Sequence, residues 1–217
     1  WFLAEGTISK SQIRLHLGNG DQPFVERLKK SIKKVFGEEA RIYHNKKTSY
    51  SLYFQSVLAA KLIEAWELKT KSTKKQIPYF IFNLNRDFQL KFIEGYFLGD
   101  GTLGKQYMSF TTSSLRLAEQ LLFLLGQMNI VATITERVPQ ANSNTYIKTK
   151  HNYFVITVCG KQQLKELRCI WHKHHSNQLL KKHLSRKTKK RQAYIKISND
   201  LIGLPVKSIN KKSHRGN

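Results

Sequence analysis

The chain has 217 residues, and its 38 lysine and arginine residues against 14 aspartate and glutamate residues give a formal net charge of +24. This length suits one large domain or two small ones. So large a positive charge indicates a polyanionic partner, and no apolar stretch is long enough to span a membrane, which favours nucleic acid. The two cysteines make no disulfide framework, no Cys/His spacing fits a zinc site and no signal peptide is visible, so we expect an intracellular protein.

The first predicted elements are a short apolar helical segment and a half-buried strand. The segment, residues 1–4, is followed by Glu5 and Gly6. In the strand that follows, apolar and polar residues alternate, and the apolar face is formed by Ile13, Leu15 and Leu17. The other face offers long side-chain donors suited to base edges in a DNA major groove, namely Lys10, Gln12, Arg14 and His16.

A helix, a hairpin and a second helix follow. Asp21 can cap a helix that ends at Gly37 and whose apolar residues recur at helical spacing: Phe24, Leu28, Ile32 and Val35. Residues 41–54 predict a hairpin with Ile42, Leu52 and Phe54 pointing inward. Its outward side chains are further candidates for DNA binding: Arg41, Tyr43, Ser51 and Tyr53. Ser56 opens the next helix, which runs through Val57, Leu58, Leu62 and Trp66.

A lysine-rich loop then leads to a longer apolar helix, residues 92–100. This helix ends in Asp100 followed by glycine, as the first segment ends in Glu5, and Gly95 and Gly99 leave one of its faces bare for a second helix. If the two segments pack there, the two acids lie side by side and each raises the cost of ionising the other. A divalent cation removes that cost, and hard oxygen ligands select Mg²⁺ or a similar ion.

The second half repeats the plan of the first, with Gly101 placed on Gly6. Met108 and Phe110 take the core positions of the first strand, and Gly160 opens the last helix of the repeat. Further polar candidates for DNA binding follow the same pattern: Lys105, Tyr107, Ser109, Thr111, Thr133, Thr135, Arg137, Lys148, Lys150 and Tyr153. Each half predicts the element order αββαββα. We therefore expect an α+β fold of two pseudo-twofold repeats, each with a four-stranded antiparallel sheet, that are joined at the two acid-ending helices.

The stretch from Ile93 to Gly101 resembles the signature motif of the LAGLIDADG homing endonucleases, whose last acid is a metal ligand. Residues 1–6 resemble the end of a first copy whose opening helical residues are absent, and two copies in one chain resemble the two-repeat monomeric members. The block of residues 75–80 (Lys-Gln-Ile-Pro-Tyr-Phe) resembles the endonuclease domain of archaeal-type inteins. Residues 200–209 resemble the strand by which such domains rejoin the splicing module.

The resemblance implies a site-specific endonuclease that makes a staggered double-strand break in a long DNA target, by divalent-metal-assisted phosphodiester hydrolysis with one strand cut per acid. It implies Mg²⁺, with Mn²⁺ as a substitute, held by Glu5 and Asp100 with Ala4 and Gly99. The implied catalytic residues are Glu5, Asp100, Lys75 and Lys182. The implied organisation is a first repeat at 1–84, a second at 85–192 and a basic extension at 193–217, in a monomer joined in cis to the host protein of an intein.

The sequence leaves several alternatives open for the activity of the protein. A catalytically inactive relative would bind DNA with the same fold, an intron maturase would bind RNA, and an intron-encoded endonuclease would share the chemistry in another host context. The two acids and Lys75 favour a nuclease over an inactive binder. Lys74 competes with Lys75, Lys181 competes with Lys182, and the polar strand faces could be ordinary solvated sheet surface.

Overall fold

The computed structural model describes residues 1–46, 49–139, 152–172, 174, 176–186, 195–196 and 202–203. Residues 1–185 form one compact unit and residues 186–217 form another. In the second unit β9 (Ile195–Lys196) pairs antiparallel with β10 (Ile202–Gly203). The first unit contains the predicted junction between repeats at residues 84 and 85. Among helices in the described ranges, none combines the length and apolarity needed to cross a membrane.

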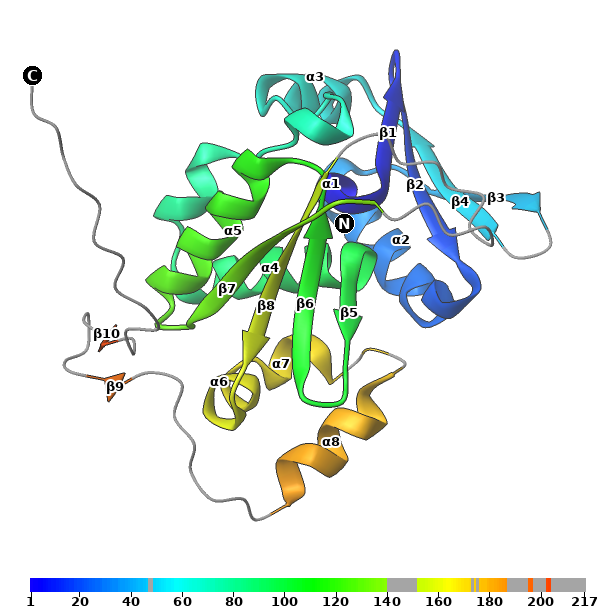
Figure 1. Cartoon of the computed structure of the whole chain (residues 1–217). Coiled ribbons are helices and arrows are strands. Elements are labelled where there is room, and N and C mark those ends of the chain that lie inside the picture. Colours follow the sequence, from blue (N-terminus) through cyan, green and yellow to red (C-terminus); the bar gives the residue numbers. More distant parts are fainter. Residues whose placement is uncertain are drawn as a thin grey trace, which may run out of the picture. The chain divides into compact units, whose positions relative to one another are not determined.

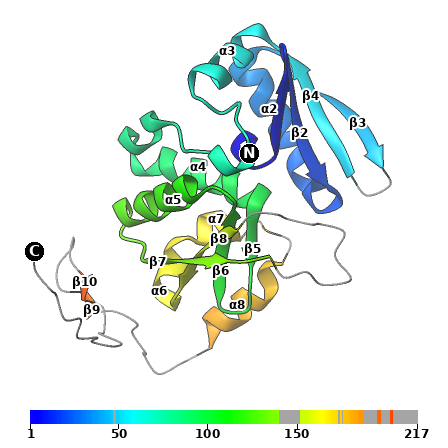
Figure 2. The same ribbon diagram turned by 45° about the horizontal axis from the view of Figure 1, so that its top comes forward.

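The first repeat is built in the predicted order, with an additional short 3₁₀ turn before its second helix. Its elements are α1 (Phe2–Glu5), β1 (Gly6–Ser9), β2 (Gln12–Gly18), η1 (Asn19–Phe24), α2 (Val25–Phe36), β3 (Arg41–Lys46), β4 (Ser49–Gln55) and α3 (Val57–Ala65). The strands form one antiparallel sheet in the order β1-β2-β4-β3. Figure 2 shows β2, β4 and β3 side by side, with α2 packed against them.

Two 3₁₀ turns, η2 (Ser72–Lys74) and η3 (Tyr79–Asn83), connect the repeats. The second repeat comprises α4 (Arg86–Asp100), β5 (Gly101–Leu103), β6 (Tyr107–Thr112), α5 (Leu115–Gln127), β7 (Ala132–Arg137), β8 (Tyr153–Cys159), α6 (Lys161–Glu166), α7 (Arg168–Trp171) and α8 (Asn177–Ser185). Its strand order, β5-β6-β8-β7, is the same as in the first repeat. The α+β architecture with two four-stranded antiparallel sheets is therefore confirmed.

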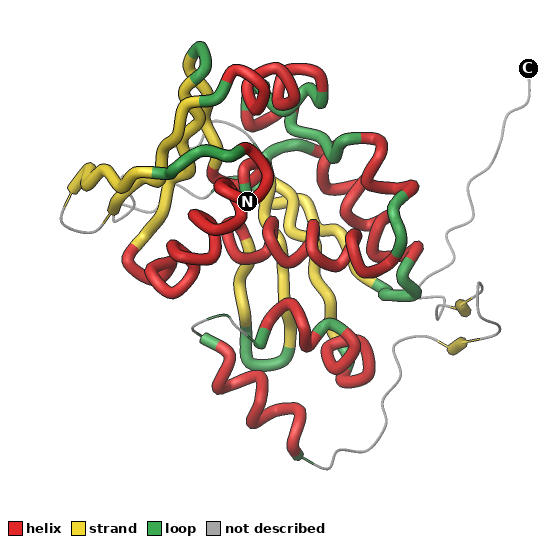
Figure 3. Tube along the Cα trace, turned by 180° about the vertical axis from the view of Figure 1, so that it is seen from behind, coloured by secondary structure: helices red, strands yellow, loops and turns green. Residues whose placement is uncertain are grey.

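The strand register shows how closely the repeats correspond. Gly6 pairs with Leu15 in the first sheet, and Gly101 pairs with Phe110 in the second, so both partners shift by 95 residues. The core-facing residues predicted for β2 and β6 are buried. Figure 3 shows helices lying over the strands of the second sheet, whereas in Figure 1 no helix lies in front of β5 and β6. Within the described part of the chain, this face of β5 and β6 therefore carries no covering helix.

Three details of the predicted packing are wrong. Val35 is 65% exposed, because the next residue, Phe36, stacks on Phe54 instead. Ile42 is 40% exposed, because its strand β3 lies at the edge of the sheet, where little packs over it. Lys10 lies in the turn between β1 and β2 with a positive φ of 54°, and not on a strand.

Candidate functional site

The two acid-ending helices, α1 and α4, pack on each other through their smallest residues. A Cβ atom added to Gly99 would lie 2.5 Å from the Cβ of Ala4, and one added to Gly95 would lie 3.1 Å from the backbone nitrogen of Trp1. Real Cβ atoms do not approach other atoms as closely as 2.5 Å, so position 99 accepts glycine alone at this spacing. The predicted bare face of α4 is thus the contact surface for α1.

This close approach predicts a sharp effect of one methyl group. Gly99→Ala is expected to destabilise the protein by about 1–3 kcal/mol, because the new side chain forces α1 and α4 apart. Gly126→Ala, on α5, is the matched control: an added Cβ there meets nothing within 4 Å. The control is expected to stabilise by about 0.5–1 kcal/mol. Urea unfolding measures both, and equal free energies for the two variants would contradict this packing.

Glu5 and Asp100 end α1 and α4, and each acid leads directly into the first strand of its sheet. Burial raises the pKa of both carboxyl groups, and the charge of Asp100 raises the pKa of Glu5 further. The ionised pair is therefore costly in the protein alone. The described residues contain no group of three or more His, Cys, Asp or Glu side chains that could hold a metal. Two carboxylates nevertheless fit Mg²⁺, which usually binds one or two carboxylates together with waters and substrate phosphates.

The acid pair predicts an unusual pH dependence of stability. A carboxyl pKa that is higher in the folded protein contributes stability below its unfolded value, and that contribution is lost as pH rises through the folded value. Without metal, Asp100→Asn should therefore raise the melting temperature relative to wild type at pH 7.5 and lose this advantage near pH 3. Mg²⁺ should raise the melting temperature of wild type at pH 7.5 and have little effect on the variant. An unchanged difference at both pH values would contradict the raised pKa values.

Lys75 lies at the acid pair. Its Nζ donates a hydrogen bond to the carbonyl oxygen of Ala4 at 2.7 Å, and its positive charge opposes the rise in the pKa of both Glu5 and Asp100. The loop that carries it is anchored to the second repeat, because Ser114 Oγ donates to the Lys75 carbonyl at 2.7 Å. The structure therefore places the Lys75 ammonium at the end of α1, close enough for its charge to act on both acids.

Tyr96 also reaches the acid pair and was not among the predicted site residues. It is 1% exposed, and a hydrogen bond from its hydroxyl lowers the pKa of Asp100. Burial and the charge of Asp100 in turn raise the pKa of the Tyr96 hydroxyl, so it remains a hydrogen-bond donor. The sequence signal was its spacing, since residues four apart on a helix share a face.

Lys182 does not lie at the acid pair. It is exposed on α8, and Figures 1 and 3 both place α8 at the end of β6 away from α1. The charge of Lys182 is not among the causes that shift the pKa of Glu5 or Asp100. The physical reason is that α8 follows α7 and carries the chain away from the motif helices. Lys181, on the same helix, is equally remote.

The polar face of the first sheet forms a connected row of side chains. Arg14 Nη2 donates to Gln12 Oε1 at 3.1 Å. The ring of His16 lies between two hydroxyls, with Nε2 3.1 Å from Thr7 Oγ1 and Nδ1 3.3 Å from Ser51 Oγ. Burial, and then the charge of Arg14, lower the pKa of His16, so its ring is neutral at pH 7. Ser51 is fully buried, which corrects its prediction as a direct DNA contact.

The remaining predicted DNA contacts divide by exposure. In the first repeat Lys10, Arg41 and Tyr43 are exposed and Tyr53 is half-buried. In the second repeat Ser109 is only 5% exposed, because it lies on a central strand between Thr102 of β5 and Thr157 of β8, and its prediction as a direct DNA contact is also corrected. Tyr153 is half-buried. The other described candidates of this repeat are exposed, namely Lys105, Tyr107, Thr111, Thr133, Thr135 and Arg137. Lys148 and Lys150 lie outside the described residues.

Residues 87–171 match the family described as the LAGLIDADG-like domain. The chain is similar to the replication factor C small subunit of Methanocaldococcus jannaschii, with 28% identity over 149 residues. It is also similar to the probable translation initiation factor IF-2 of the same organism, with 26% identity over 161 residues. The matched segments cover 67% and 71% of this chain but only 8% and 13% of those two proteins. The chain thus spans a small part of its curated relatives.

Two solved structures show the same fold. I-DmoI in complex with DNA and Ca has a TM-score of 0.53 at 13% identity, covering 78% of this chain and 84% of that chain. Full-length DUF199/WhiA from Thermatoga maritima has a TM-score of 0.52 at 12% identity, covering 88% of this chain and 59% of that chain. Residues 87–171 are therefore similar to the LAGLIDADG-like domain, and the chain adopts a two-repeat fold similar to that of I-DmoI.

Proposed function

We propose that this chain is a site-specific homing endonuclease that makes a double-strand break in a long duplex DNA target, as the endonuclease part of an intein. The observation that carries the proposal is the pairing of Glu5 and Asp100 at the ends of two packed motif helices, with Lys75 beside them. Acids at helix C-termini oppose the helix dipole, so a pair of them there needs a compensating cation. The fold of I-DmoI, an endonuclease solved with DNA and Ca, supports the same conclusion.

The proposed metal ligands are Glu5 and Asp100, with the backbone carbonyls of Gly99 and of Ala4 as further oxygen donors. In this structure the Ala4 carbonyl accepts the hydrogen bond from Lys75, so it would bind a metal through its second lone pair or after Lys75 turns to the phosphate. When bound, Mg²⁺ or Mn²⁺ supplies Lewis-acid stabilisation of the negative charge that develops on the phosphate and on the leaving oxygen. Structures of I-DmoI with DNA in the presence of Ca or Mn support a divalent cation in general. The choice of Mg²⁺ follows from the hard oxygen donors and the small number of carboxylates.

The protein side chains around the acids have separate roles in this proposal. The Lys75 ammonium faces the scissile phosphate and stabilises its transition-state charge. Its hydrogen bond to Ala4 fixes the end of α1, and therefore the direction of the Glu5 side chain. A hydrogen bond from the Tyr96 hydroxyl favours the ionised form of Asp100, against the effect of burial on the pKa of that carboxyl group.

The proposed DNA surface is the pair of open sheet faces. Exposed cations and hydroxyls on these faces contact phosphates for affinity, while the row of Gln12 and Arg14 reads base edges. The net charge of +24 provides the long-range attraction to duplex DNA. The acids on these faces are few, which keeps the surface attractive to phosphate. In this proposal the chain binds as a monomer, because its two repeats already supply two half-sites.

A substitution in this row tests the proposed reading of bases. Arg14→Ala is expected to cost about 1–3 kcal/mol of binding to the preferred target and to relax base preference at one position. Lys34→Ala, an exposed cation on α2 away from the sheet faces, should leave the preference unchanged. Binding selection from a randomised duplex library measures both. Identical preference profiles for wild type and Arg14→Ala would contradict the role of Arg14.

The intein assignment is supported by where similar segments occur. Replication factor C and a translation initiation factor are functionally unrelated, yet each matches this chain over a small part of its length. A mobile segment inserted into different host proteins accounts for this pattern. The block of residues 75–80 and residues 200–209 resemble the corresponding parts of intein endonuclease domains. We accordingly propose a host protein in cis and place 193–217 at the junction with the splicing module.

One alternative has its own support, because the fold is equally similar to DUF199/WhiA. In that alternative the chain binds DNA without cutting it. The deciding experiment incubates the protein with plasmid libraries, including randomised DNA and host genes without the insertion, in Mg²⁺ or EDTA. Metal-dependent linear product at discrete sites supports the endonuclease. Tight binding to DNA without cleavage in any metal favours the binding-only alternative. Binding to RNA that persists in the presence of excess duplex DNA favours a maturase.

A further inference from the structure

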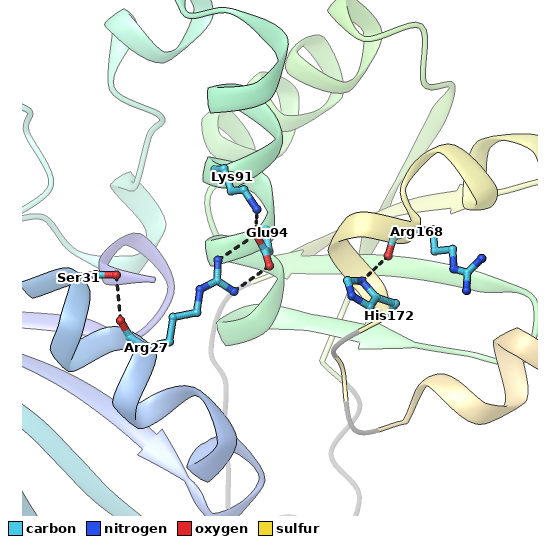
Figure 4. Close-up of polar contacts among 6 residues, drawn as sticks. All are labelled: Arg27, Ser31, Lys91, Glu94, Arg168 and His172. Carbon is cyan, nitrogen blue, oxygen red and sulfur yellow. Dashed lines mark hydrogen bonds and ion pairs between the residues drawn. The ribbon is translucent and has the colours of Figure 1, made fainter.

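A buried carboxylate links the second motif helix to the first repeat. Glu94, on α4, is only 2% exposed. Arg27, on α2 of the first repeat, donates two hydrogen bonds to it, from Nη1 to Oε1 at 2.9 Å and from Nη2 to Oε2 at 3.2 Å. Lys91, one turn earlier on α4, donates to Oε2 at 3.0 Å. Figure 4 shows the Arg27 guanidinium reaching across from α2 to Glu94.

This ion pair adds a directional interaction to the apolar contact between the motif helices. Glycine and alanine let α1 and α4 approach closely, and Leu3 of α1 belongs to the same buried cluster as Ile93 and Phe97 of α4, but apolar contacts of this kind are not directional. A bidentate arginine–carboxylate pair is directional, because both partners are planar and two parallel hydrogen bonds fix their orientation. Arg27 and Glu94 therefore add an orientation-dependent restraint on α4 to the apolar contact between the motif helices.

The position of Glu94 connects this restriction to the acid pair. Glu94 precedes Asp100 by six residues on the same helix, a rise of about 9 Å. Gly95 and Gly99, which contact α1, lie between them. The first repeat thus holds α4 at two levels, through Arg27 at one and through Ala4 at the other. A rotation of α4 that broke the Arg27 pair would also move Asp100 away from Glu5.

We propose that Arg27 and Glu94 are a positioning pair that fixes the two repeats in one relative orientation and thereby couples the cutting of the two DNA strands. The coupling rests on the proposed endonuclease function, whereas the fixed orientation does not. A buried carboxylate is costly unless it is paired, and Arg27, whose side chain is 47% exposed, supplies that pairing from the first repeat. Neither residue contacts the proposed DNA faces, so their effect is transmitted through the position of α4.

The test compares Arg27→Ala and Arg27→Lys with a matched control, Lys91→Ala. The control removes a second cation from the same carboxylate but no link between repeats. Electron–electron double resonance measures the distance between spin labels at Lys34→Cys on α2 and Glu119→Cys on α5, after Cys159→Ser and Cys169→Ser. In parallel, single-turnover plasmid cleavage measures the ratio of nicked to linear product. Cooperative thermal unfolding first establishes that each variant is folded.

The expected result for Arg27→Ala is a broader distance distribution and about a tenfold higher ratio of nicked to linear product. Arg27→Lys, which keeps the charge and loses the bidentate geometry, should give intermediate values and serves if Arg27→Ala does not fold. Lys91→Ala should match wild type in both measurements. A folded Arg27 variant with the wild-type distance distribution would overturn the positioning role. Absence of cleavage by wild type would instead refute the proposed function, while the distance measurement still tests the pair.

Discussion

Glu5→Gln and Asp100→Asn should each slow the cutting of one DNA strand by about 10³-fold or more, because a metal ligand contributes several kcal/mol of transition-state stabilisation and each 1.36 kcal/mol is tenfold in rate. Each single variant is therefore expected to nick plasmid DNA, and the double variant to leave it intact. Both side chains lose only a charge and keep their shape, so the fold should be retained. Gel analysis of supercoiled, nicked and linear plasmid over time measures these rates.

Glu119→Gln is the matched control for the acids, because it removes an exposed carboxylate from a helix of the second repeat. It should cut both strands at the wild-type rate. Wild-type rates for Glu5→Gln and Asp100→Asn as well would show that the acid pair has no part in cleavage. Binding measured in Ca²⁺ should be retained by both single variants, since most affinity comes from phosphate contacts on the sheet faces.

Lys75→Ala should reduce the cleavage rate by about 10²–10³-fold, the usual effect of removing one group that stabilises transition-state charge. The structure gives the reason, since Lys75 contacts Ala4 and is the lysine whose charge acts on both Glu5 and Asp100. Lys74→Ala removes the neighbouring exposed charge and should change the rate little. Single-turnover kinetics at saturating protein separate this effect from weaker DNA binding.

A second readout separates catalysis by Lys75 from a structural role. Loss of its charge should raise the pKa values of Glu5 and Asp100 further, which shifts the acid limb of the pH–rate profile to higher pH. Lys75→Arg, which keeps the charge, should restore much of that shift. Equal rates for Lys74→Ala and Lys75→Ala would contradict the assignment and make the lysine-rich loop a general DNA contact.

The fold was largely predictable because its signals are local. The alternation that places Ile13 and Leu15 in the core lies within one strand, and the same alternation recurs after Gly101. The wrong predictions concern side chains whose burial or exposure depends on other elements of the fold. Periodicity assigns Ile42 to the inner face, but only the strand order reveals that β3 is an edge strand. Ser51 alternates outward together with Tyr53, two positions along the strand, yet it is fully buried.

The acid pair of the candidate site was predictable, because the duplication places an acid at the end of each motif helix. Glu5 and Asp100 end equivalent helices, so each acid points to the other. No sequence pattern indicates a contact between distant segments. Arg27 and Glu94 are 67 residues apart and look like ordinary surface charges in the sequence. Lys182 was placed by analogy with Lys75, but the second repeat has no Ile-Pro block to fix an equivalent loop.

The most direct test of the central proposal is to map the cut positions in a target duplex labelled on both strands, under single-turnover conditions with Mg²⁺ and with EDTA. We predict one cut in each strand at fixed positions with Mg²⁺, and an intact duplex with EDTA. A duplex that is bound specifically but stays intact in Mg²⁺ and in Mn²⁺ would contradict the proposed endonuclease.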